Sequence, residues 1–250
     1  DGLDVDAGRR LEPAARLACV APSHQHQLGA VVRLPRRLQL IDWAVQQDAW
    51  ILEDDYDSEY RYAGRPLAAL QGLDRSERVI YVGSFSKVLF PSLRLGYLVV
   101  PPALVDGFRR ARQVLDDHAS LLAQPALARF IDEGHFASHI RRTRRLYANR
   151  QQALLAAAAR HLDGLLSLAP DEAGMHLLAD LGPALAPALD DRAVAGTAAR
   201  EADVVVGALS AFYMGPVARQ GLVMGYAGYD EAAIEGAVAR LGRVLAGKSV

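Results

Sequence analysis

The sequence contains a single cysteine, Cys19, among its 250 residues. One cysteine excludes an intramolecular disulfide and any metal site built from several cysteines, and it favours a reducing compartment. Charged residues interrupt every apolar stretch before it reaches the roughly 18 residues that a membrane helix needs. We therefore expect no membrane span and a cytoplasmic location. Lysine and arginine number 28 against 29 acidic residues, and this balance excludes a uniformly basic nucleic-acid-binding chain.

Hydrophobic residues make up 51% of the sequence, which is enough to form a substantial core. The sequence begins with Asp1 rather than methionine, and we expect it to be a fragment of a longer protein. Short β-type runs alternate with helical patterns through the first half, which predicts an α/β domain with a mostly parallel sheet. The expected strands lie at residues 16–21, 49–53, 78–83 and 95–100.

The pattern changes in the second half of the sequence. Residues 124–161 have a helical pattern that is interrupted at Gly134. Beyond them, the sequence predicts a small α+β layer, with short strands at 164–168, 174–181, 203–206 and 221–227 and helices at 190–200 and 230–245. We therefore predict a large domain over residues 1–150 and a small C-terminal domain over residues 151–250.

An acidic run, EDDYDSE at residues 53–59, follows directly on an apolar strand. In α/β folds ligands bind at the carboxyl edge of the sheet, so these carboxylates are candidates for a binding site. Two other interpretations stay open at this point. The run can be a solvated loop or helix cap, or Asp54, Asp55 and Asp57 can form a site for a divalent metal.

A second group of polar residues follows the next predicted strand. Ser84, Ser86 and Lys87 come directly after it, and Arg94 begins the strand that comes next. A shielded lysine can form a Schiff base with an aldehyde, and the planar guanidinium of an arginine suits a phosphate. Together with a carboxylate that can pair with a pyridine nitrogen, such as Asp54, these groups meet the needs of pyridoxal 5′-phosphate.

Six strings in the sequence resemble the aminotransferase-like domain of MocR-type regulators, a subgroup of the GntR family of bacterial transcription factors. They are PSHQ at 22–25, EDDYDSE at 53–59, GRP at 64–66, LQGLD at 70–74, VIYVGSFSK at 79–87 and LRLGY at 93–97. The resemblance implies a fold-type I, class I/II aminotransferase-like α/β fold. It also implies that part of the large domain, with a glycine-containing phosphate loop and an aromatic that stacks on the pyridine, lies upstream of this sequence.

The resemblance assigns a role to each matching position. Lys87 matches the lysine that forms the Schiff base with pyridoxal phosphate. Asp54 matches the carboxylate that pairs with the pyridine nitrogen, and Tyr56 matches the phenol that hydrogen-bonds the 3′-oxygen of the cofactor. The phosphate-binding positions are Ser84, Ser86 and Arg94. The resemblance implies no metal site, and we interpret Asp55 and Asp57 as structural.

The sequence departs from the family pattern at two positions. His26 stands where aminotransferases have an asparagine near the 3′-oxygen, and we include it among the cofactor-binding candidates. Catalytic aminotransferases have an arginine in the last strand that binds the carboxylate of the substrate. Here Val223 stands at that position, and Arg219 lies four residues earlier. The absence of this arginine puts recognition of a substrate carboxylate in question.

The resemblance predicts a pyridoxal-phosphate-binding domain that senses an amine or amino-acid effector in a transcriptional regulator. DNA would be bound only through a winged-helix domain that is absent from this sequence, and the family's architecture implies a homodimer. The alternative is an active class I/II aminotransferase that transfers an amino group from an amino acid to a keto acid. A metal-dependent hydrolase that uses the acidic run is a third hypothesis.

Overall fold

The computed structural model describes residues 2–119, 121–186 and 188–248, which form two units. The first contains the residues up to His26 together with Ala30–Glu59 and Gly64–Arg141. The second contains Gln27–Gly29, Tyr60–Ala63 and the residues from Arg142 onward. The division between the two units falls after Arg141, inside one long helix. The domain boundary near residue 150 remains a prediction.

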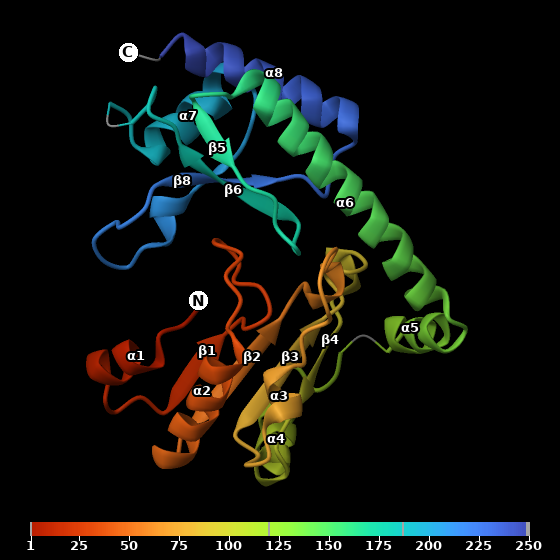
Figure 1. The fold of residues 1–250 in the computed structure, drawn as a ribbon. Coiled ribbons are helices and arrows are strands. Elements are labelled where there is room, and N and C mark those ends of the chain that lie inside the picture. The colour runs from red at the N-terminus through yellow and green to blue at the C-terminus, as the bar shows by residue number, and fades with distance from the viewer. Residues whose placement is uncertain (1, 120, 187, 249–250) are drawn as a thin grey trace. The chain divides into compact units, whose positions relative to one another are not determined.

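A four-stranded sheet in the order β1-β2-β3-β4 forms the centre of the first unit (Figure 1). Its strands are β1 (Leu17–Val20), β2 (Trp50–Asp55), β3 (Val79–Ser84) and β4 (Gly96–Val99). The first three are parallel, and β4 is antiparallel to β3. The four strands and the mostly parallel sheet confirm the α/β prediction. The direction of β4 brings its first residues beside the last residues of β3.

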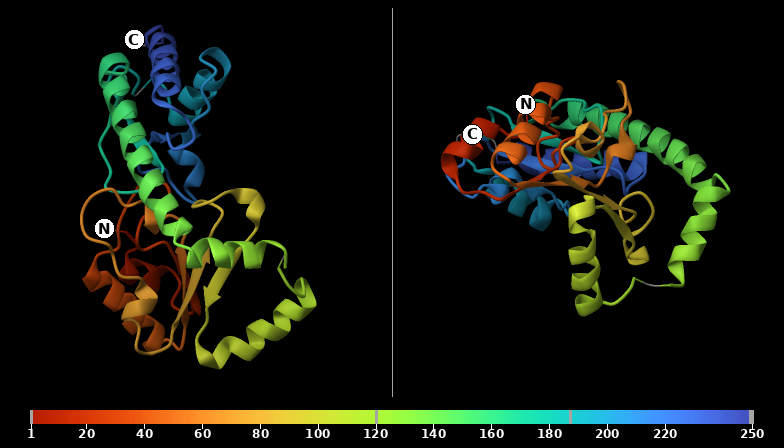
Figure 2. Two further views of the ribbon diagram at one scale, coloured as in Figure 1. Left: turned by 90° about the vertical axis from the view of Figure 1, so that its right-hand side faces the viewer. Right: turned by 90° about the horizontal axis from the view of Figure 1, so that it is seen from below.

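In the chain of the first unit, helices come before, between and after the strands of this sheet. They are α1 (Val5–Leu11), α2 (Leu34–Gln46), α3 (Leu70–Leu73), α4 (Val105–Leu115) and α5 (Ala123–Asp132). Short 3-10 turns lie at Ser58–Tyr60, Pro91–Leu93 and Pro102–Leu104. A proline in the first turn of α2, where a backbone N–H has no partner within the helix, is favourable for starting it. Figure 2 shows the next helix, α6 (His135–His161), as one continuous rod.

The core of the first unit lies between α1, α2, α3 and one face of the sheet. Its buried residues are Val5, Val20, Leu40, Ile41, Trp43, Ala44, Ala49, Ile51, Leu70 and Val79. Successive side chains of a strand point to opposite faces, so Ile51 and Glu53 of β2 are buried while Asp54 is exposed. By contrast, all four residues of β4 are exposed, and α4 and α5 contain no buried residue. The apolar core therefore depends on the chain before β4.

The second unit contains an antiparallel sheet in the order β5-β6-β8-β7. Its elements are β5 (Leu166–Leu168), β6 (His176–Leu181), α7 (Asp191–Glu201), β7 (Gly207–Ala208), β8 (Gly221–Gly225) and α8 (Glu231–Ala246). This confirms the predicted α+β layer, but one predicted strand is wrong. Residues 203–206 form no strand, and the paired residues are Gly207 and Ala208. The prediction placed this strand on the three consecutive valines at 204–206, which directly precede the paired residues.

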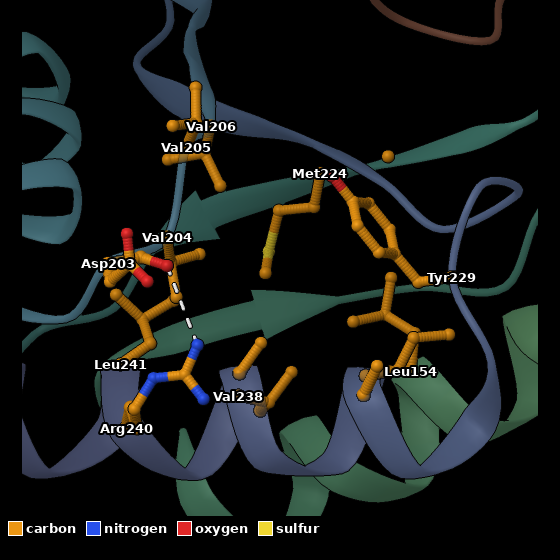
Figure 3. Close-up of a pocket in the computed structure, with 14 residues that line it drawn as sticks. Leu154, Asp203, Val204, Val205, Val206, Met224, Tyr229, Val238, Arg240 and Leu241 are labelled. Atoms are coloured by element: carbon orange, nitrogen blue, oxygen red, sulfur yellow. Dashed lines mark hydrogen bonds between the residues drawn. The ribbon is translucent and has the colours of Figure 1, made fainter.

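A cavity of about 360 Å³ lies in the second unit between β8, α8 and the segment after α7. Figure 3 shows Met224, Val238 and Leu154 among the side chains that line it, with Arg240 at one side. Arg240 donates from Nε to the carbonyl oxygen of Ala202 at 2.9 Å. None of the residues predicted to bind a cofactor lines this cavity. Within the residues described, no helix combines the length and apolarity needed to cross a bilayer.

Candidate functional site

Glu53 begins the acidic run and points into the core. Its two carboxylate oxygens accept hydrogen bonds from the backbone N–H groups of Leu70 and Gln71 at 2.7 and 2.8 Å, where α3 starts. Burial raises the pKa of Glu53 above its ordinary value, although these two hydrogen bonds act to lower it. The side chain is 1% exposed, so its role is to join β2 to α3.

Asp55 and Asp57 also have partners within the protein. Asp55 accepts hydrogen bonds from the hydroxyls of Ser58 at 2.7 Å and Tyr81 at 2.6 Å. Burial, followed by the hydrogen bond to Asp55, raises the pKa of Tyr81. Asp57 is 1% exposed and lies 2.9 Å from the Nδ1 atom of His24. These contacts give both carboxylates a local structural role.

Asp54 differs from its neighbours because it is exposed and makes no hydrogen bond or ion pair with any residue that the structure describes. It lies in register with Val82 of β3, close to the carboxyl end of both strands. Partial burial and the negative charges of Asp55 and Asp57 raise the pKa of its carboxyl group. A cation placed beside Asp54 would relieve this repulsion, so the position suits a positively charged ligand group.

The predicted serines and lysine lie at the end of β3 and in the loop that follows it. The backbone N–H of Ser86 donates to the Oγ atom of Ser84 at 3.1 Å, so the Ser84 hydroxyl keeps its own hydrogen for another acceptor. Lys87 follows one residue later and is exposed to solvent. The sequence contains only one other lysine, Lys248, at the far end of the chain. Amine chemistry at a side chain is therefore confined to two positions.

Arg94 reaches the same end of the sheet from the opposite direction. It is exposed and has a φ of 51°, in the left-handed region, at the end of the turn Pro91–Leu93. Gly96 pairs with Ser84, and the N–H of Phe85 donates to the carbonyl oxygen of Leu95 at 3.2 Å. These backbone contacts fix the start of β4 beside the end of β3. Arg94 and the two serines therefore belong to backbone segments that meet at one end of the sheet.

Glycine at position 83 allows β3 and β4 to pack in this way. A Cβ atom at this position would collide with the ring of Tyr97, which lies across β3. The ring centroid of Tyr97 is 5.9 Å from that of Tyr81 and 5.6 Å from that of Phe85. The aromatic cluster keeps Phe85 in place, and Phe85 lies between Ser84 and Ser86.

Tyr56, within the acidic run, contacts two histidines, His24 and His26. The Tyr56 hydroxyl donates to the backbone oxygen of His24 at 3.1 Å and lies 3.2 Å from His24 Nδ1. The ring of His26 is exposed, with its centroid 5.8 Å from that of Tyr56. The sequence predicted a role for His26 but none for His24. Its only signal was its place in the string PSHQ, because its partner Asp57 is distant in the sequence.

The sequence also left open a divalent metal site made of Asp54, Asp55 and Asp57. Among residues 2–119, 121–186 and 188–248, no three side chains of His, Cys, Asp or Glu are placed together to hold a metal ion.

In the second unit, Arg219 makes a forked ion pair with Asp180, with distances of 2.8 and 2.7 Å. Asp180 is the largest influence on the pKa of Arg219 and raises it. Val223 lies on β8 in register with Leu178.

The arrangement combines groups of complementary chemistry at one end of a sheet. Lys87 supplies an amine, Ser84, Ser86 and Arg94 supply donors for an anion, and Asp54 supplies an acceptor for a cation. Such a donor set fits a ligand that has an aldehyde, a phosphate and a protonated ring nitrogen. These groups are part of the set that pyridoxal phosphate requires, and all of them lie in the first unit.

Comparison with known proteins assigns this fold to a family. The profile of "Aminotransferase class I and II" matches residues 12–241, most of the chain. The chain belongs to the class I and II aminotransferase family. The family's fold also agrees with solved structures. Over 98% of this chain, the structure is similar to LysN, an α-aminoadipate aminotransferase from Thermus thermophilus complexed with N-(5′-phosphopyridoxyl)-L-leucine, with a TM-score of 0.84 and 29% identity. This chain covers 62% of that protein.

Two regulators in the same family are more similar in sequence. The chain is 48% identical over 230 residues to the probable rhizopine catabolism regulatory protein MocR of Rhizobium meliloti. It is 38% identical over 215 residues to the HTH-type transcriptional regulator YhdI of Bacillus subtilis. The matches cover 92% and 86% of this chain, but 45% of each regulator. The chain therefore spans about half the length of the curated relatives it matches. The identities of 48% and 38% confirm the resemblance to MocR-type regulators.

Proposed function

We propose that this chain is the pyridoxal-phosphate-binding, effector-sensing domain of a MocR-type transcriptional regulator. Lys87 would hold the cofactor covalently, Asp54 would pair with its ring nitrogen, and Tyr56 would hydrogen-bond its 3′-oxygen, with His26 beside it. Ser84, Ser86 and Arg94 would bind its phosphate. When bound, the cofactor supplies an aldehyde that condenses with amines and a ring that withdraws electrons.

The observation that carries this proposal is the contrast between Asp54 and the other carboxylates of the run. Glu53, Asp55 and Asp57 are hydrogen-bonded within the protein, whereas Asp54 is exposed at the strand end. An ionised aspartate stabilises a protonated pyridine through its charge, and the pairing would in turn lower the raised pKa of Asp54. Lys87 and the residues that would donate hydrogen bonds to the phosphate lie at the end of β3 and in the loop after it, and β3 is paired with β2.

The regulatory assignment rests on the relatives rather than on the fold. The regulators MocR and YhdI are 48% and 38% identical to this chain, whereas LysN is 29% identical. In such a regulator, an amine or amino-acid effector would condense with the cofactor, and a winged-helix domain would bind DNA. An effector changes DNA affinity only by favouring one conformation of the protein over another. We expect the regulator to be a cytoplasmic homodimer, in line with the family's architecture.

A second candidate function is transfer of an amino group by the same site. It is favoured by the family and by Lys87, since a lysine amine can move the proton that transamination requires. It is weakened at the last strand, where Val223 offers no charge for a substrate carboxylate. Incubation with an amino acid and a keto acid separates the two functions. Repeated turnover would favour the enzyme, and condensation without release of product would favour the sensor.

The chain's two lysines allow a direct test of the cofactor site. We expect pyridoxal phosphate to give the chain a visible absorbance band that Lys87→Ala abolishes, because that variant lacks the reacting amine. Lys248→Ala is the matched control, since Lys248 pairs with Glu201 at 3.1 Å in the second unit. The control should keep the band. Equal absorbance in wild type and Lys87→Ala would contradict the proposed site.

A further inference from the structure

A buried histidine and a buried aspartate lie behind Tyr56. His24 is 2% exposed and Asp57 is 1% exposed, and the distance from His24 Nδ1 to an Asp57 carboxylate oxygen is 2.9 Å. The same Nδ1 atom is 3.2 Å from the Tyr56 hydroxyl. We propose that His24 and Asp57 are positioning residues that fix the Tyr56 hydroxyl for its hydrogen bond to the cofactor. This inference rests on the proposed function, because it concerns how the protein orients one of the cofactor's contacts.

The chemistry of the contacts assigns the hydrogen on the imidazole. A carboxylate accepts hydrogen bonds, so Nδ1 carries a hydrogen and donates it to Asp57. Fixing a histidine's tautomer through a carboxylate on one ring nitrogen is a common way to orient a functional group. Asp57 therefore determines both the tautomer and the ring plane of His24. Because both side chains are buried, the pair has little freedom to adopt another geometry.

His24 contacts the Tyr56 hydroxyl through two of its atoms. The hydroxyl donates to the backbone oxygen of His24 at 3.1 Å. Its own oxygen is 3.2 Å from Nδ1, so it is the second and weaker acceptor of the one Nδ1–H hydrogen, which Asp57 accepts at 2.9 Å. A hydroxyl has one donor and two acceptor sites, so it can turn its hydrogen toward a ligand while still accepting from Nδ1–H. Hydrogen bonds in a chain polarise one another. Donation from His24 therefore makes the Tyr56 hydroxyl a better donor to a negatively charged oxygen.

The proposed link makes His24 act through Tyr56, and this predicts how variants combine. A hydrogen bond from Tyr56 stabilises the deprotonated form of the bound cofactor, so its loss should raise the pKa at which the cofactor's absorbance changes. We expect Tyr56→Phe to raise this pKa by about 0.5 to 1, the equivalent of one hydrogen bond. His24→Ala should raise it in the same direction by a smaller amount. Adding His24→Ala to Tyr56→Phe should have no further effect.

Two conservative variants keep the test valid if His24→Ala does not fold. The side-chain amide of His24→Asn places an N–H donor close to the position of Nδ1–H, so it should restore a pKa near that of the wild type. Asp57→Asn keeps an acceptor but removes the charge, so it should give an intermediate shift. The matched control is His161→Gln, because His161 lies 2.7 Å from Glu235 in the second unit. Removing that histidine–carboxylate pair should leave the cofactor's pKa unchanged.

A measurement without cofactor separates this inference from the proposed function. Nitrogen NMR of histidine-labelled chain should show His24 with its hydrogen on Nδ1, and Tyr56→Phe should shift that resonance. If this holds but wild type and Lys87→Ala have the same absorbance with pyridoxal phosphate, the proposed function fails while the link from His24 to Tyr56 stands. A hydrogen on Nε2 alone would overturn the inference. So would His24 variants that fold and bind cofactor with an unchanged pKa while Tyr56→Phe shifts it.

Discussion

The acidic run at the end of β2 and the loop after β3 lie at the same edge of the sheet, but their charged side chains differ in burial. In the acidic run, Glu53 and Asp57 are buried and hydrogen-bonded within the protein. In the loop, Lys87 and Arg94 are exposed. Asp54 belongs to the run by sequence but shares the exposure of the loop. Glu53 and Asp57 are thus buried and hydrogen-bonded within the protein, whereas Asp54, Lys87 and Arg94 lie at the surface of this edge.

Strand geometry produces the difference between neighbouring carboxylates. Glu53 and Asp54 are consecutive residues of β2, so their side chains point to opposite faces of the sheet. Glu53 enters the core and finds two backbone N–H groups, whereas Asp54 faces away from the core. A shift of register by one residue would exchange their roles. Variants at Glu53 and Asp54 therefore test whether the buried carboxylate contributes to stability and the exposed one to cofactor binding.

The largest effect is expected from Asp54→Asn. The amide has no charge, so it should weaken pyridoxal phosphate binding by about 10- to 1,000-fold, which corresponds to a change of 1–3 in the pKa of the ring nitrogen. Titration of the visible absorbance with pyridoxal phosphate measures the dissociation constant. The thermal unfolding midpoint should change little, because Asp54 makes no hydrogen bond or ion pair with any residue the structure describes.

Asp42→Asn serves as the matched control for this variant. Asp42 is also an exposed aspartate, on α2, and it is not among the groups at the sheet edge. Its replacement should leave the dissociation constant unchanged. Equal losses of affinity in the two variants would mean that net charge, rather than the position of Asp54, determines binding.

A smaller effect, and one on folding, is expected from Glu53→Gln. The glutamine presents an amide NH₂ group to one of the two backbone N–H groups, so one buried hydrogen bond is lost. We expect a decrease of about 1–3 kcal/mol in the free energy of unfolding. Chemical denaturation at fixed pH measures this decrease, and the dissociation constant for pyridoxal phosphate of the folded variant should stay close to that of the wild type.

The pH dependence of the same variant gives a second check. The pKa of Glu53 is raised in the folded protein above its ordinary value of 4.5, so the folded state holds this proton more tightly than the unfolded state. The proton-linked part of the contribution of Glu53 to the free energy of unfolding is therefore fully present below pH 4.5 and is lost as the pH rises through the folded-state pKa. Glu53→Gln should lack this component. Identical pH profiles and equal stabilities in the two proteins would contradict a buried, hydrogen-bonded Glu53.

Short-range sequence patterns were sufficient to predict much of this structure. The apolar runs located all four strands of the first unit, and the polar residues after β2 and β3 marked the edge where the candidate site lies. The direction of β4 could not be predicted, because periodicity does not encode strand pairing. The function of Glu53 was missed because α3, which it contacts, has only four residues and no helical pattern to detect.

Contacts between distant residues account for the other omissions. His24 and Asp57 are far apart in the sequence, and only the parallel pairing of β1 with β2 brings the segments after them together. In the second unit, β7 has two residues, which is too short for an alternating pattern. Residues 203–206 have the composition of a strand but no partner strand in the structure. Composition alone therefore did not locate the paired strand.

Covalent trapping of the cofactor tests the central claim most directly. The chain is incubated with pyridoxal phosphate, reduced with borohydride, digested, and mapped by mass spectrometry. We expect the phosphopyridoxyl group on Lys87, with Lys248 essentially unmodified at low cofactor concentration. Equal labelling of the two lysines, or a label on Lys248 or the terminal amine alone, would contradict a cofactor site at the end of β3.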